Sequence, residues 1–68
     1  MLSDDQLARV RFAYRVYSTG NSYGASASTV SAALDLVGKV VEAEGVAYSI
    51  SPESFTRHAK EILAKSEN

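Results

Sequence analysis

The sequence predicts an all-α fold, a compact three-helix domain, from three features. Apolar residues recur at the helical period through the middle of the chain, from residue 28 to residue 44. Helix-capping side chains stand before two other segments, at Ser3 and at Ser51. Small polar residues and glycines separate the segments. With 68 residues there is room for a single domain, and we expect helices near 3–18, 28–44 and 52–65 with a loop at 18–27.

The first predicted helix begins with a capping box. Ser3 is placed to accept a hydrogen bond from the amide of Gln6, whose side chain returns to the amide of Ser3. Asp4 and Asp5 then lie at the positive end of the helix dipole. The inward stripe predicted from the helical period consists of Leu7, Val10, Ala13, Tyr14 and Tyr17.

Residues 10–16 also fit a strand. β-branched and aromatic side chains alternate there with arginine and alanine, which is the period of a half-buried strand. The alternative fold is therefore α+β, with a short strand or hairpin around residues 10–16. The capping box favours the helix. In a helix, Phe12 and Val16 fall outside the inward stripe and form a second apolar strip that a monomer leaves uncovered.

The central helix has an apolar face wide enough to cover two neighbours. Its apolar side chains span roughly 160° of the circumference, against about 100° for a helix with one partner. Asp35 and Lys39 form a favourable i,i+4 pair on the opposite face, and Gly45 is the expected left-handed residue that ends the helix. Gly38 lowers the stability of the helix by about 1 kcal/mol relative to alanine. It marks either a tolerated irregularity or a close approach by another helix, within the chain or across a dimer. The apolar face consists of Val30, Ala33, Leu34, Leu36, Val37, Val40 and Val41.

A loop is expected between the first and the central helix. Residues 18–27 are small and polar with Gly20 and Gly24, and this composition favours a flexible linker over a loop with a function. The two glycines do not form a phosphate-binding motif.

The last helix starts with Ser51 as N-cap and Pro52 at the first helical position. Its inward stripe consists of Phe55, Ala59, Ile62 and Leu63.

Composition argues against several classes of function. The chain has no cysteine, which removes disulfides and thiolate metal sites, and no zinc-binding spacing occurs. His58 is the one histidine, and without an accompanying nucleophile motif or orienting acid we interpret it as a structural or surface residue. A net charge of −1 gives no strong attraction for nucleic acid or an anionic membrane. With neither an apolar run of about 18 residues nor a signal segment, we expect a cytoplasmic chain with no membrane partner. Without convergent ionisable groups or metal-ligand spacing, we expect no enzymatic activity, cofactor or metal site.

Aromatic and arginine residues point to a protein interface. Four tyrosines and two phenylalanines provide a large aromatic surface for a chain with so small a core. Tyr and Arg dominate interface hot spots. We therefore expect a small non-catalytic protein–protein interaction module, of adaptor or inhibitor type, that binds another protein and acts as a homodimer. The alternative is a nucleic-acid-associated regulatory protein that uses the Arg/Tyr face of the first helix. The predicted partner-binding residues are Arg11, Tyr14, Arg15, Tyr17 and Tyr23, and the predicted self-association residues are Phe12, Val16 and Gly38.

Overall fold

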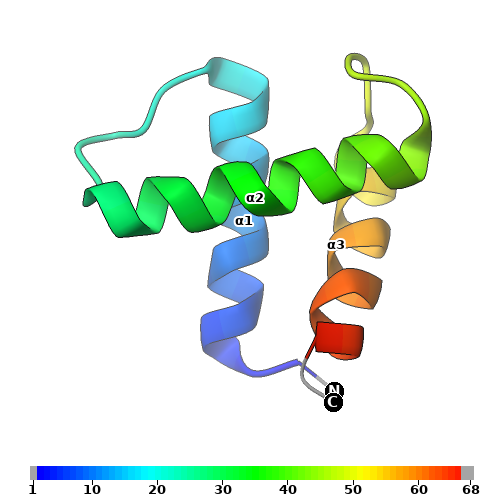
Figure 1. The fold of residues 1–68 in the computed structure, drawn as a ribbon, viewed down its shortest axis with the longest axis horizontal. Coiled ribbons are helices and arrows are strands. Elements are labelled where there is room, and N and C mark those ends of the chain that lie inside the picture. Colours follow the sequence, from blue (N-terminus) through cyan, green and yellow to red (C-terminus); the bar gives the residue numbers. More distant parts are fainter. Residues whose placement is uncertain (1, 67–68) are drawn as a thin grey trace.

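The computed structural model describes residues 2–66 and confirms the all-α, three-helix prediction. The helices are α1 (Asp4–Thr19), α2 (Ala27–Glu44) and α3 (Pro52–Ser66). α1 and α3 lie side by side and run in opposite directions, and α2 crosses both of them (Figure 1). Each helix contacts the other two. The molecule is flat, with extents of 29 × 25 × 16 Å, and α2 occupies one of its two broad faces.

α1 is continuous through residues 10–16, so the α+β alternative is wrong. The capping box is present in both directions, since Gln6 N–H donates to Ser3 Oγ and Ser3 N–H donates to Gln6 Oε1. These bonds satisfy amide groups that a helix start leaves without partners. The helix ends at Thr19, and Gly20 takes the left-handed conformation with its N–H bonded to Val16 O at 2.8 Å. The ambiguous stretch thus lies inside a helix that is capped at both ends.

α2 begins one residue earlier than predicted. Ser26 is its N-cap and accepts a hydrogen bond from Thr29 N–H, which places Ala27 inside the helix and shortens the preceding loop to residues 20–26. Gly45 ends the helix as predicted, with φ 87° and its N–H bonded to Val41 O. The Asp35–Lys39 ion pair is also confirmed, at 3.2 Å.

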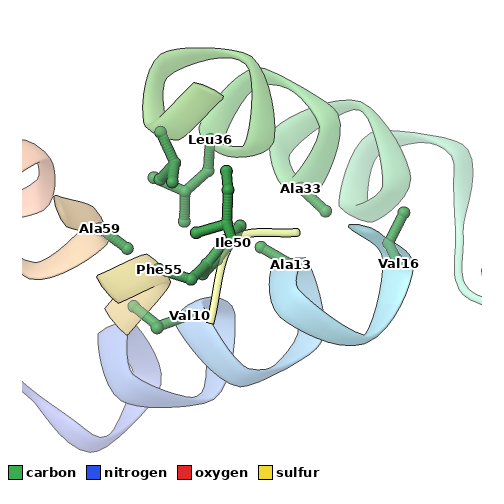
Figure 2. Packing of buried hydrophobic residues seen from close by; sticks show 9 residues of the cluster. Val10, Ala13, Val16, Ala33, Leu36, Ile50, Phe55 and Ala59 are labelled. Atoms are coloured by element: carbon green, nitrogen blue, oxygen red, sulfur yellow. The ribbon is translucent and has the colours of Figure 1, made fainter. Parts of the chain in front are cut away.

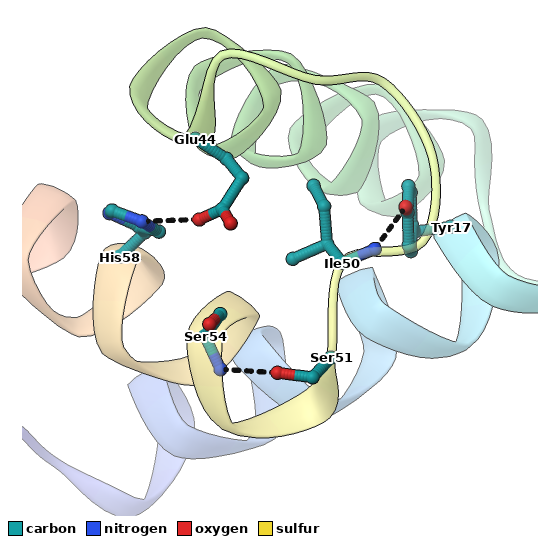
Figure 3. Close-up of polar contacts among 6 residues, drawn as sticks. All are labelled: Tyr17, Glu44, Ile50, Ser51, Ser54 and His58. Carbon is teal, nitrogen blue, oxygen red and sulfur yellow. Dashed lines mark hydrogen bonds and ion pairs between the residues drawn. The ribbon is translucent and has the colours of Figure 1, made fainter.

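α3 is capped as the sequence predicted. Ser54 N–H donates to Ser51 Oγ at 3.1 Å (Figure 3), and Pro52 is the first helical residue. Proline suits this position because its missing N–H would have no helical acceptor there.

The core lies between α2 and the pair formed by α1 and α3. Phe55 is fully buried at its centre, and its ring contacts the rings of Tyr14 and Tyr17 at centroid distances of 5.3 and 5.6 Å. Figure 2 shows side chains of all three helices and of Ile50, from the loop before α3, converging on this position. The buried set is Val10, Ala13, Val16, Ala33, Leu36, Val40, Ile50, Phe55 and Ala59.

Two side chains lie opposite to prediction. Val16 is buried, at 8% exposure, because α2 passes over this part of α1 and Ala33 faces it (Figure 2). Leu34 was predicted to point inward and is 54% exposed. The buried side chains of α2 form a narrower stripe than the predicted arc, and Leu34 lies beyond its edge.

The Tyr17 hydroxyl holds the loop before α3, and its removal should destabilise the domain. Ile50 N–H donates to Tyr17 Oη at 3.1 Å in a partly buried position (Figure 3). Tyr17→Phe leaves this amide without its acceptor, and we expect the free energy of unfolding to fall by about 1–2 kcal/mol in urea titrations. Tyr14→Phe is the matched control, since Tyr14 contacts the same Phe55 ring. Equal losses in the two variants would contradict a specific role for the hydrogen bond.

Candidate functional site

Large apolar and aromatic side chains that remain exposed are concentrated on α2 and the two loops that flank it. Within residues 2–66, no such side chain lies on α1 or α3. The exposed side chains are spread along the length of α2 and its two loops, and single exposed apolar side chains are normal on a protein surface. The exposed large apolar residues all lie in the segment 23–48, and none of them lies on α1, which the sequence favoured. The exposed residues are Tyr23, Leu34, Val46 and Tyr48.

The predicted partner-binding residues divide into two groups. Tyr14 and Tyr17 are half-buried and pack against the Phe55 ring, so they belong to the edge of the core. Arg11, Arg15 and Tyr23 are exposed. The structure thus retains three of the five residues as a surface open to a partner, and it brings two of these three into contact.

Arg15 and Tyr23 form a stacked pair on this surface. The guanidinium carbon of Arg15 lies 4.1 Å from the centroid of the Tyr23 ring, within the range of a cation–π interaction. Thr19 joins the pair, because its hydroxyl donates to Arg15 O at 2.6 Å and accepts from the Tyr23 hydroxyl at 3.3 Å. Asn21 Oδ1 accepts from Tyr23 N–H at 2.8 Å. We call these four residues the Arg15–Tyr23 platform.

The loop that carries the platform makes hydrogen bonds that its composition alone did not predict. Side chains of α1 and of the loop hold its backbone, and Asn21 N–H also bonds to Thr19 Oγ1. Tyr23 has φ 54°, a left-handed conformation that a residue with a side chain adopts at a cost. The hydrogen bond with Thr19 lowers the pKa of Tyr23, since the Thr19 hydroxyl can turn toward a phenolate, and the Arg15 guanidinium acts in the same direction. The hydrogen bonds of Tyr23 and its stacking on Arg15 position the Tyr23 ring, although the ring faces solvent.

The predicted self-association residues have three different environments. Val16 is buried in the core, so its assignment to a self-association surface is wrong. Phe12 is half-buried and packs against the core. Gly38 is exposed on α2, and a Cβ atom built there would meet nothing within 4 Å. Of the three, Gly38 is the residue that is exposed to solvent.

A groove of about 630 Å³ lies beside the crossing of α2 over α1 and α3. Phe12, Leu36 and Ile62 contribute apolar lining. Charges of both signs line it as well, so it shows no preference for an anionic or a cationic ligand. These charged residues are Asp5, Arg9, Asp35 and Lys39.

His58 joins the end of α2 to α3. Its Nε2 atom lies 2.7 Å from Glu44 Oε2, and both side chains are partly buried (Figure 3). The sequence indicated a structural or surface role for His58 but gave no sign of Glu44 as its partner, since 14 residues separate the two. No group of three or more His, Cys, Asp or Glu side chains within residues 2–66 could hold a metal ion. The geometry supports a role of this pair in packing α2 against α3.

Comparison with known proteins does not assign the chain to a class. No protein-family model matches it, and neither a curated protein nor a solved structure matches it. No helix of the described residues has the length and apolar character needed to cross a membrane.

Proposed function

We propose that this chain is a small non-catalytic protein–protein interaction module, of adaptor or inhibitor type, that acts as a homodimer. The observation that carries the proposal is the Arg15–Tyr23 platform, an exposed arginine stacked on an exposed tyrosine. Arginine and tyrosine are enriched among interface residues that contribute most to affinity. The platform is held by hydrogen bonds before any partner binds, which lowers the entropy lost on association.

The partner that this surface suits carries acidic side chains. Arg11 and Arg15 are one turn apart on α1 and both are exposed. Within the described part of the chain, neither arginine forms an ion pair with a carboxylate. Guanidinium groups bind carboxylates through paired hydrogen bonds, so a protein surface with Asp or Glu beside an apolar contact for Tyr23 complements the platform.

A nucleic-acid partner is the competing class. Arginine and tyrosine also stack on unpaired bases, but binding to a phosphate backbone depends on a positive field. The net charge is −1, and Asp4 and Asp5 lie on the same helix as the arginines. We therefore favour the protein partner and use salt dependence to separate the two classes.

Substitution of the platform tests the proposal directly. We expect Arg15→Ala and Tyr23→Ala each to weaken binding of a protein partner by about 1–2 kcal/mol, roughly five- to thirtyfold in Kd, because hot-spot contacts are lost. Their melting points should stay within a degree or two of the wild type, since both residues are exposed. The measurement is affinity capture from source-cell extract with each variant as bait, followed by titration of the captured protein. Arg57→Ala, at an exposed arginine of α3, is the matched control.

The outcomes separate the alternatives. Loss of the captured protein with both platform variants, and its retention with Arg57→Ala, supports the proposal. A gel shift of single-stranded DNA or RNA that weakens steeply as salt rises would replace it with the nucleic-acid function. Unfolding of Arg15→Ala or Tyr23→Ala would show that these residues serve the fold and not a partner.

A further inference from the structure

One hydroxyl group connects every part of the Arg15–Tyr23 platform. Thr19 is the last residue of α1, and its side-chain oxygen donates to Arg15 O at 2.6 Å. The same oxygen accepts from Asn21 N–H at 3.2 Å and from the Tyr23 hydroxyl at 3.3 Å. A hydroxyl group has one proton and two lone pairs to offer in hydrogen bonds. All three are therefore in use, one toward the helix and two toward the loop.

The three bonds of the Thr19 hydroxyl act on different parts of the platform. The bond to Arg15 O returns one turn along α1 and fixes the Thr19 side chain against the end of the helix. The bond from Asn21 N–H fixes the start of the loop, where Asn21 Oδ1 accepts from Tyr23 N–H at 2.8 Å. The bond from the Tyr23 hydroxyl fixes the far end of the ring. Tyr23 is thus held at its backbone and at its hydroxyl, with the Arg15 guanidinium stacked over the ring between them.

The backbone conformation of Tyr23 requires this support. A φ of 54° is left-handed, which is unfavourable for a residue with a Cβ atom. Such conformations persist where the surrounding contacts determine them, and they are concentrated at binding sites. Tyr23 is exposed, so burial does not provide those contacts, and its hydrogen bonds with Thr19 and Asn21 do.

We infer that Thr19 is the positioning residue of the platform: its hydroxyl fixes the Tyr23 ring, and the ring in turn fixes the Arg15 guanidinium, before a partner binds. The consequence for binding rests on the proposed function, whereas the positioning is a property of the free chain. Thr19 contributes to affinity without touching the partner. It does so by removing freedom that Arg15 and Tyr23 would otherwise lose on association.

Ser18 provides a matched control for the loss of a hydroxyl. Its Oγ atom donates to the same carbonyl, Arg15 O, at 3.4 Å, and Ser18 is exposed on the same turn of α1. Among the described residues, its side chain forms no hydrogen bond with the loop. Ser18→Ala therefore removes a hydroxyl from the end of α1 and leaves the platform in place. Thr19→Val removes the Thr19 hydroxyl and keeps the branched shape, and Thr19→Ser keeps the hydroxyl.

The first measurement is made by NMR on the free chain. In Thr19→Val we expect the backbone order parameters of Asn21 and Tyr23 to fall toward the values of a flexible loop, below about 0.6. We also expect the pKa of Tyr23, which the Thr19 hydrogen bond lowers, to rise toward its ordinary value, because the phenolate loses a donor. The ring-carbon resonance of Tyr23 reports this titration separately from those of the other tyrosines. Ser18→Ala and Thr19→Ser should keep the wild-type order parameters and titration.

The second measurement is the affinity for the protein that the wild-type chain captures. Thr19→Val should weaken this affinity roughly two- to tenfold in Kd, because the Arg15 and Tyr23 side chains then have to be ordered on binding. Thr19→Ser and Ser18→Ala should bind as the wild type does, since both keep the hydroxyl that contacts Tyr23.

An unchanged Tyr23 titration and unchanged order parameters in Thr19→Val would overturn the positioning role. Unfolding of Thr19→Val would overturn it as well, because the hydroxyl would then serve the fold. If Arg15→Ala and Tyr23→Ala lose the partner while Thr19→Val behaves as the wild type, the proposed function stands and the positioning role fails. If the NMR changes occur but no platform variant affects partner binding, the positioning role stands and the proposed function fails.

Discussion

Phe55→Ala is expected to unfold a large fraction of the molecules at room temperature. Phe55 is fully buried and contacts two tyrosine rings, so its truncation opens a cavity at the junction of the three helices. Phenylalanine-to-alanine changes in cores cost about 3–5 kcal/mol. A domain of this size has a total stability of about 3–10 kcal/mol, so the loss equals the whole at the lower end of that range.

Circular dichroism during urea and thermal unfolding measures this effect. Tyr48→Ala is the matched control, because it removes an aromatic ring that is 76% exposed. We expect its stability to stay within about 0.5 kcal/mol of the wild type. A folded Phe55→Ala variant with a loss below about 1 kcal/mol would contradict the central position of this ring.

The helix boundaries could be predicted because their signals are local. Ser3, Gln6, Gly45 and Ser51 act on backbone groups no more than four residues away, and each takes the predicted role. The strand pattern of residues 10–16 was the competing local signal. The described residues contain no strand with which it could pair, whereas the capping box provides hydrogen bonds for helix amides.

The rotation of each helix against its neighbours could not be predicted in the same way. The helical period gives the width of an apolar arc, but the crossing of α2 over α1 and α3 decides which part of the arc is covered. Val16 and Leu34 were misplaced for this reason. Both lie near the edge of their arcs, where a small rotation exchanges a buried and an exposed side chain.

The candidate site was predicted as residue types and not as a contact. Arginine and tyrosine suggested an interface, yet the stacking of Arg15 on Tyr23 depends on a loop fixed by Thr19 and Asn21. Side chains of Thr and Asn bond to nearby backbone in many loops, so their presence alone did not distinguish this loop from a linker. The left-handed conformation of Tyr23 carried no sequence signal, because tyrosine is unusual there.

Leu36 and Leu34 offer a direct measurement of the helix rotation. They are two residues apart on α2, yet Leu36 is 5% exposed and Leu34 is 54% exposed. Leu36→Ala should lower the free energy of unfolding by about 2–5 kcal/mol, because it removes buried methyl groups and leaves a cavity. Leu34→Ala should change it by no more than about 0.5 kcal/mol, since its side chain already contacts water.

The comparison is made by urea unfolding at a protein concentration low enough to keep the chain monomeric, so that any contribution of Leu34 to the dimer does not enter. Both substitutions remove the same atoms from the same helix, so helix propensity cancels between them. The difference then reports burial alone. Similar losses in the two variants would mean that α2 is rotated from its position here.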